Sequence, residues 1–160
     1  MCFVLFAGTV NTLPRVAFNN EAPGLSVESL TERDAAVRQH FSNPEVQYVG
    51  STCGCGCDFP NVLLQNGSWP TLDSEETEKD EFEVAADIRH RHNCKLLVSL
   101  LRANGDETVE LYGFWHGDDT DIANPPHALE DISLDRILDS DFRFKEQVLY
   151  RIHAQSDAGN

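Results

Sequence analysis

Three cysteines separated only by single glycines, at positions 53, 55 and 57, limit how the chain can fold around them. In a fully extended strand Cys53 and Cys57 would lie about 13 Å apart, too far for both to bind one ion through Zn–S bonds of about 2.3 Å. The intervening glycines allow the backbone to bend sharply. The segment is therefore predicted to form a bent loop whose thiols bind a metal, pair as a disulfide or provide one reactive thiolate.

Cys55 and Cys57 are the pair that one metal ion could bind most easily, with Cys53 as a further candidate ligand. Clustered thiolates favour zinc or iron. A structural zinc site needs four ligands, and the run lacks the paired Cys-x2-Cys spacing typical of zinc domains, so other ligands must come from elsewhere. Two alternatives stay open: a redox-active or nucleophilic thiol, and a glycine-dictated turn in which the cysteines have no chemical role.

A long helix is predicted over residues 84–102, ending at Gly105, and it is the one element that could supply several missing ligands. These candidates are Cys94, His90 and His92. Cys94 also continues an apolar stripe at helical spacing with Leu97, Val98 and Leu101. A buried core thiol is therefore the alternative for Cys94. His92 lies at helical spacing from apolar positions, where a histidine is more often a core or boundary residue than a metal ligand. His90 is therefore the histidine that is freer to bind a metal.

Cys2 offers a different chemistry. If Met1 is removed, the α-amine of Cys2 could act as the base for its own thiol, as in N-terminal nucleophile hydrolases. The chain resembles the amidotransferases that begin with such a cysteine only at this residue, because Phe3 stands where they have glycine. The alternative is that Cys2 is an ordinary residue of a buried strand over residues 2–7.

A second candidate site follows the aromatic strand predicted over residues 108–116. Trp115, His116 and Asp118 gather an indole, an imidazole and a carboxylate where a strand ends, and such a place could hold a cation or a polar ligand. In this hypothesis the protein is a ligand-binding or interaction module. The alternative is a solvated hairpin turn, because glycine and aspartate are common turn residues.

Hydrophobic alternation and turn residues predict about six strands. The strands are expected over residues 2–7, 25–30, 46–50, 108–116, 132–134 and 148–153. The chain shows neither an internal repeat nor a linker between two cores. We therefore expect one α+β domain over residues 1–154, with a mixed or antiparallel sheet and two main helices, followed by a flexible tail over residues 155–160.

The first of the two helices is expected in the segment between Thr31 and Pro44. Thr31 opens a capping box, and Pro44 closes the segment because proline cannot continue a helix. Ala36, Val37 and Phe41 supply an apolar stripe that could pack on the sheet.

Charge and cysteine usage narrow the function classes. The 160-residue chain has a formal net charge of −15, which repels nucleic-acid phosphates and anionic lipids, so neither nucleic acid nor membrane is an expected partner. Its apolar first residues lack a preceding basic segment, so no export signal is predicted. Five cysteines without such a signal indicate a reducing compartment, and the cytoplasm is the expected location. The partner classes that stay open are small molecules and proteins.

Three parts of the chain together resemble a group of small uncharacterised bacterial proteins. They are residues 1–9, residues 46–59 and residues 115–118. The resemblance spans most of the chain, and it implies a common fold and a common pocket. It implies no activity, because none is known for such proteins.

The cysteine motif of that group is Cys-Gly-Cys-Gly-Phe after a strand that ends in Gly-Ser. Cys55 and Cys57 match this motif, whereas Cys53 is an addition and Asp58 replaces a glycine. The group has Trp-Asp-Gly-Asp at the end of the aromatic strand, so His116 is a second departure. The resemblance therefore implies a site centred on two cysteines.

Overall fold

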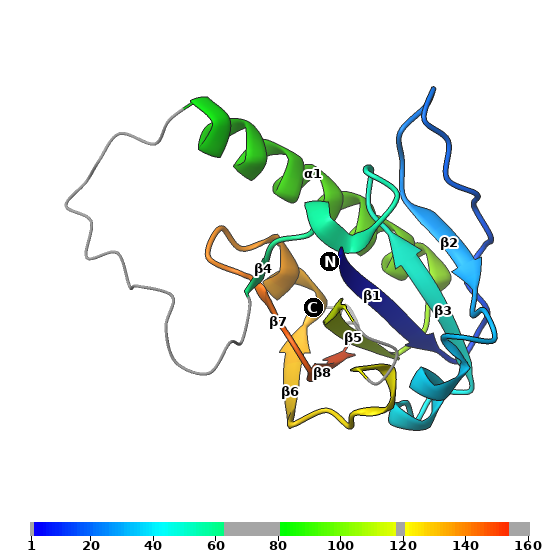
Figure 1. Cartoon of the computed structure of the whole chain (residues 1–160). Coiled ribbons are helices and arrows are strands. Elements are labelled where there is room, and N and C mark those ends of the chain that lie inside the picture. The colour runs from blue at the N-terminus through cyan, green and yellow to red at the C-terminus, as the bar shows by residue number, and fades with distance from the viewer. Residues whose placement is uncertain (1, 63–80, 118–120, 154–160) are drawn as a thin grey trace.

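A six-stranded sheet with the strand order β2-β3-β1-β5-β8-β6 forms the centre of the molecule (Figure 1). Its strands are β1 (Cys2–Thr9), β2 (Ser26–Ser29), β3 (Glu45–Gly50), β5 (Thr108–His116), β6 (Ala128–Ser133) and β8 (Val148–His153). All neighbouring strands are antiparallel except β6 and β8, which are parallel. The computed structural model describes residues 2–62, 81–117 and 121–153, and the predicted tail over residues 155–160 lies outside this range. The α+β architecture with a mixed sheet is confirmed.

The first strand occupies the middle of the sheet, between β3 and β5. A hydrophobic core lies on each face of the sheet. Alternate side chains of β1 pack into one core or the other, because successive side chains of a strand point to opposite faces. Phe3 and Leu5 belong to the core beneath the long helix, and Phe6 belongs to the core on the other face. The prediction that this strand is buried on both faces is confirmed.

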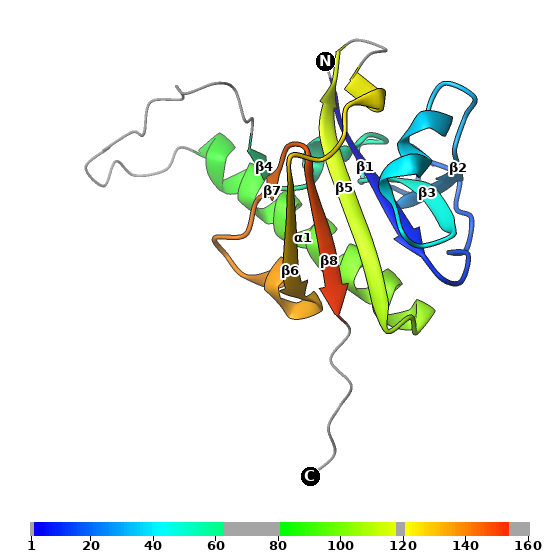
Figure 2. The ribbon, with the colours of Figure 1, turned by 90° about the horizontal axis from the view of Figure 1, so that it is seen from below.

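The helix α1 (Glu81–Asn104) lies across one face of the sheet (Figure 2). Its buried apolar stripe consists of Cys94, Leu97, Val98 and Leu101. At its end Gly105 adopts a φ of +74°, a left-handed conformation that glycine accepts without strain, and its N–H donates to the Arg102 carbonyl at 3.2 Å. The long helix is confirmed and starts three residues before the predicted position. Among the described residues, no helix is both long enough and apolar enough to span a membrane.

The prediction of a second main helix is wrong. The segment forms only the short 3₁₀ helix η1 (Ala35–His40). The Asp34 N–H donates to the Thr31 hydroxyl at 3.3 Å, but this contact precedes the helix, whose N-cap residue Asp34 makes no side-chain capping hydrogen bond. Val37 is the buried residue of this helix, whereas Ala36 is exposed. One buried side chain provides too little contact to stabilise several helical turns, since most helical stability comes from packing of an apolar face.

Two further differences concern short elements. The fifth predicted strand, over residues 132–134, differs from the observed β6, which begins earlier, at Ala128. Leu134 begins the 3₁₀ helix η4 (Leu134–Leu138) instead. The structure also contains a small parallel pair of two-residue strands, β4 (Asn61–Val62) and β7 (Phe144–Lys145). Strands this short contain no full alternation of polar and apolar residues, so sequence periodicity does not reveal them.

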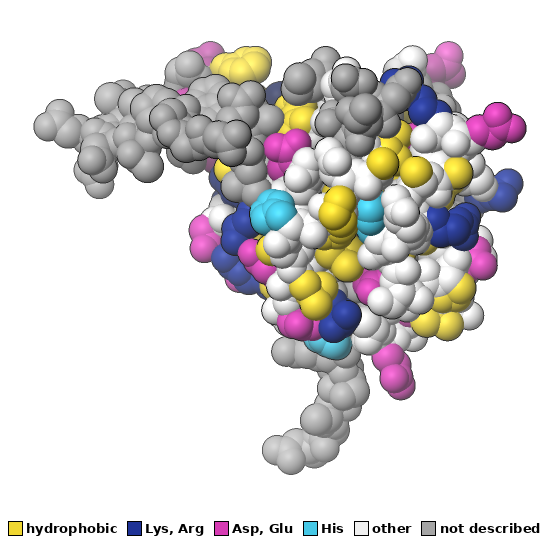
Figure 3. Space-filling model, turned by 60° about the horizontal axis from the view of Figure 1, so that its bottom comes forward, with side chains coloured by type: hydrophobic (Ala, Val, Ile, Leu, Met, Phe, Trp, Pro, Cys, Tyr) yellow, Lys and Arg dark blue, Asp and Glu magenta, His cyan; other side chains and the backbone are white. Residues whose placement is uncertain are grey.

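The face turned to the viewer in Figure 3 carries interspersed acidic, basic, histidine and apolar side chains. On this face the described basic side chains do not gather into one extended patch.

We expect Tyr150 to make stability depend on pH in the alkaline range. Its side chain is 1% exposed, its hydroxyl accepts a hydrogen bond from the Lys145 N–H at 2.9 Å, and burial raises its pKa to about 12. The pKa in the unfolded chain is about 10. Because the folded-state pKa is the higher one, the neutral hydroxyl contributes stability below about pH 10, and this contribution is lost as the pH rises towards 12.

Tyr150→Phe is therefore expected to cost about 1 kcal/mol at neutral pH, because the Lys145 N–H loses its acceptor. The variant should also lose less stability than the native protein on going to alkaline pH. Urea unfolding over a pH series measures both effects. Parallel pH curves for the two proteins would contradict the assignment of this ionisation to Tyr150.

Candidate metal centre

The cysteine loop lies against the first residues of β1. Strands β1 and β3 are antiparallel and pair as far as Phe6, so the start of β1 extends beyond the paired region, next to where β3 ends at Gly50. The 3₁₀ helix η2 (Gly56–Asp58) occupies this position. A Cβ atom on Gly56 would lie 2.7 Å from the Phe3 carbonyl oxygen, so the close approach of η2 to β1 requires glycine here.

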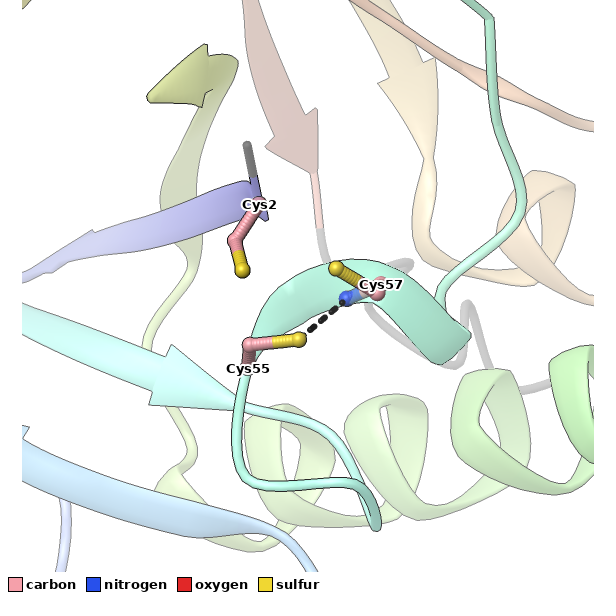
Figure 4. Close-up of side chains that lie close together, drawn as sticks. All are labelled: Cys2, Cys55 and Cys57. Carbon is pink, nitrogen blue, oxygen red and sulfur yellow. Dashed lines mark hydrogen bonds between the residues drawn. The ribbon is translucent and has the colours of Figure 1, made fainter. Parts of the chain in front are cut away.

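Three thiols meet where η2 and β1 touch. Cys2 comes from β1, Cys55 from the residue before η2 and Cys57 from within η2, and their Sγ atoms all lie within 4.8 Å of one another (Figure 4). Two thiolates on one tetrahedral zinc ion lie about 3.8 Å apart, given Zn–S bonds of about 2.3 Å. Small side-chain adjustments would thus bring all three sulfurs to one ion. This group, the three-thiol group below, could hold a metal ion.

The loop before η2 is shaped by hydrogen bonds to a single serine. The Ser51 N–H and hydroxyl both donate to the Cys55 carbonyl, and the Asp58 N–H donates to the Ser51 hydroxyl at 3.3 Å. Gly54 adopts a φ of +86°, and its N–H donates to the Ser51 carbonyl at 2.9 Å. The bent, glycine-dependent loop predicted from the sequence is confirmed.

Asn93 fastens this loop to the long helix. It is fully buried, its Oδ1 accepts a hydrogen bond from the Thr52 N–H at 2.9 Å, and its Nδ2 donates to the Thr52 hydroxyl at 3.0 Å and to the Arg89 carbonyl at 2.9 Å. One turn earlier on the helix, Arg89 lies 3.6 Å from the Asp58 carboxylate. Sequence analysis missed Asn93. The available signal was its position four residues before Leu97, where a polar side chain on a buried face must find partners.

Cys2 was also missed as a member of the site, since the sequence analysis considered it only as a nucleophile or a strand residue. Its role follows from strand pairing. In an antiparallel pair the end of one strand lies beside the beginning of the other, so β3 delivers Cys55 and Cys57 to the start of β1. The position of Cys2 in the first strand therefore becomes informative only when the strand order is known.

Cys53 and Cys94, the other two candidate ligands, do not belong to the three-thiol group. Cys53 is exposed, and its Sγ lies 3.4 Å from the Sγ of Cys55 and 3.2 Å from the Ser51 hydroxyl. Cys94 is buried in the core beneath α1, the position that the core-thiol alternative describes. Neither His90, which is half-buried, nor His92, which is exposed, joins the group.

Cys94 also borders a small hollow between α1 and the segment after η4. Pro60, Asp87, Arg91, Phe142 and Arg143 contribute to its lining. Its volume of about 20 Å³ has room for about one water molecule. Burial raises the pKa of Cys94 to about 11, so this thiol is protonated at neutral pH and is a poor nucleophile.

The predicted ligand pocket at the end of β5 is not formed by Trp115 and His116 together. Trp115 packs against the Phe3 ring at a centroid distance of 5.9 Å, whereas His116 lies beside Phe114 on the other face of the sheet, at 6.4 Å. Consecutive strand residues point to opposite faces, which explains the separation. Asp118 lies outside the described residues. Within the described part of the chain, the buried Nε1 of Trp115 and Nδ1 of His116 find no hydrogen-bond partner.

The loop thiols differ in acidity. Burial raises the pKa of Cys55 well above its usual range, and the neighbouring thiols of Cys57 and Cys53 add to this effect. Burial also opposes ionisation of Cys53, but its hydrogen bonds with Ser51 and Cys55 together outweigh burial, so the pKa of Cys53 is lowered. The Cys57 N–H donates to the Cys55 Sγ at 3.3 Å and so partly compensates a negative charge on that sulfur. A metal ion binding here would displace the proton of Cys55.

Fold and site together define an α+β protein with a three-thiol group that could hold a metal ion. Comparison of the chain with protein-family models, with curated proteins and with solved structures found no match. The resemblance to small bacterial proteins therefore stays a prediction.

Proposed function

We propose that the protein binds one zinc ion through the thiolates of Cys2, Cys55 and Cys57. The supporting observation is the convergence of three sulfurs, within 4.8 Å of one another, from two segments that lie far apart in the sequence. Thiolates prefer soft ions, and zinc is commonly bound by cysteine. Zinc is favoured over an iron–sulfur cluster because such clusters usually take four cysteine ligands, whereas this group provides three.

The fourth coordination position would face solvent. Cys2 is exposed, and Cys55 and Cys57 are only partly buried, so a water molecule or an external ligand can reach an ion between them. Three protein ligands with one open position are typical of zinc sites that exchange ligands or take part in chemistry, in contrast to closed structural sites. We therefore propose a zinc site with an exchangeable ligand, in a reducing compartment such as the cytoplasm that keeps the thiols free.

Metal stoichiometry in single-cysteine variants tests this proposal. Protein purified under reducing conditions and incubated with Zn²⁺ is expected to bind one equivalent, measured by native mass spectrometry and elemental analysis. Cys2→Ser, Cys55→Ser and Cys57→Ser should each lose this equivalent under competition with a chelator, because each removes one of the three proposed ligands among the described residues. Substitution with Co²⁺ should give thiolate-to-cobalt charge-transfer bands that weaken in each variant.

Cys53→Ser is the matched control, since Cys53 lies in the same loop and is exposed, but stands outside the three-thiol group. It should retain the zinc equivalent. A metal-free native protein would contradict the proposal. So would a variant set in which Cys53→Ser loses zinc while Cys2→Ser keeps it, because the ion would then bind within the loop alone.

A further inference from the structure

Cys53 is the one thiol that lies next to the three-thiol group without belonging to it. Its Sγ is 3.4 Å from the Sγ of Cys55, and its side chain is the more exposed of the two. We infer that Cys53 is an oxidation site for hydroperoxides, and that its oxidation product is a disulfide with Cys55 that releases the bound metal. The release of metal rests on the proposed zinc site, whereas formation of the disulfide does not.

The loop geometry already favours this pairing. A disulfide has an S–S distance of about 2.05 Å, so the two sulfurs need to approach by little more than 1 Å. Gly54 between them turns the backbone with its φ of +86°, and the turn is held by the Gly54 N–H bond to the Ser51 carbonyl. A bridge that closes so small an exposed loop is expected to be reducible, as labile regulatory disulfides are.

The chemistry balances with one hydroperoxide. The Cys53 thiolate attacks the O–O bond, which gives a sulfenic acid on Cys53 and releases the alcohol or water. The Cys55 Sγ then attacks the Cys53 Sγ, the S–O bond breaks, and its oxygen leaves as water. Two thiols and one hydroperoxide thus become one disulfide, one alcohol or water molecule and one further water. The two electrons lost by the sulfurs reduce the peroxide.

The consequence for the metal follows from the positions of the thiols. Cys53 is not a member of the three-thiol group, so it can react with peroxide while the other sulfurs hold the ion. Once Cys55 is part of a disulfide it is no longer a thiolate, and only Cys2 and Cys57 remain as protein ligands. Two ligands bind zinc far more weakly than three, so the ion dissociates and a thiol reductant restores binding.

The test compares the native protein with the Cys53→Ser variant, both loaded with zinc. Both are treated with hydrogen peroxide at the concentration that releases half of the zinc from the native protein. Zinc release is followed with a colorimetric chelator, and the disulfide is mapped by peptide mass spectrometry without reduction. We expect a Cys53–Cys55 link and zinc loss in the native protein, retention of zinc in the variant, and recovery of zinc binding after reduction. A link of Cys55 to Cys57 or Cys2, or equal zinc loss in both proteins, would overturn the inference.

The same oxidation of metal-free protein separates this inference from the proposed zinc site. If the Cys53–Cys55 link forms but the reduced protein never binds zinc, the zinc proposal fails and the oxidation site stands. If zinc binds as proposed but peroxide yields no Cys53–Cys55 link, the oxidation site fails alone. Cys53→Ala provides a second variant, and Cys94 should stay unmodified in every sample because it is buried.

Discussion

Replacing Asn93 with leucine is expected to lower the free energy of unfolding of the metal-free protein by about 3 kcal/mol. Leucine is similar in size and favours helix, so the loss comes from polar groups that are left without partners. The partly buried Thr52 N–H and hydroxyl would lose the Oδ1 and Nδ2 atoms of Asn93 as partners, and leaving such a group without a partner costs about 1–3 kcal/mol when water cannot replace it. Urea unfolding measures the change.

The same substitution should weaken zinc binding by about tenfold, because Asn93 holds the loop that carries Cys55 and Cys57 without touching either sulfur. Ser99→Ala, at an exposed position of the same helix, serves as the control and should change neither quantity appreciably.

A double-mutant cycle with Thr52→Val makes the assignment specific. If the two side chains act through their mutual hydrogen bonds, the double variant loses less stability than the sum of the single variants. Additive losses would show that Asn93 stabilises the helix for another reason.

The strands that sequence analysis predicted best are those with continuous local patterns. For β5 and β8 the predicted ranges coincide with the observed bounds, because aromatic and β-branched residues alternate up to clear turn residues. The prediction of a second main helix failed over the segment that forms η1, because only Val37 of the predicted apolar stripe is buried and no side chain caps the helix. A local start signal does not decide the length of a helix, which depends on packing.

Only the part of the site whose residues lie close together in the sequence could be predicted. Cys55 and Cys57 stand out because their spacing requires a turn, and the structure places both in the three-thiol group. Cys2 could not be assigned, since its place depends on the antiparallel pairing of β1 and β3, which no pattern within either strand specifies. Asn93 could not be assigned either, because the role of a buried polar residue depends on its hydrogen-bonding partner in another element.

Replacing Gly56 with alanine is expected to have the largest effect on metal binding of any substitution that leaves all thiols in place. The new Cβ would lie 2.7 Å from the Phe3 carbonyl oxygen, which belongs to the backbone of the central strand and cannot rotate away. Instead η2 must move away from β1, and Cys55 and Cys57 on either side of Gly56 move with it. We expect a loss of about 2 kcal/mol in the metal-free protein, typical of overpacking, and loss of the zinc equivalent under chelator competition.

Gly24→Ala is the matched control, because an added Cβ there meets nothing within 4 Å. It should leave zinc binding unchanged and the stability equal or slightly raised, since alanine restricts the unfolded chain more than glycine does. Urea unfolding and chelator competition on both variants give the comparison.

The pair Gly56→Ala and Cys2→Ser distinguishes a metal site between β1 and the loop from a site within the loop alone. Cys2→Ser removes a sulfur and leaves the geometry, whereas Gly56→Ala keeps every sulfur and separates Cys2 from the other two. A site between two elements requires both substitutions to release zinc. If the ion were bound by Cys53, Cys55 and Cys57, the loop could shift as a unit and Gly56→Ala would retain zinc. Zinc retention in both variants would therefore exclude Cys2 as a ligand.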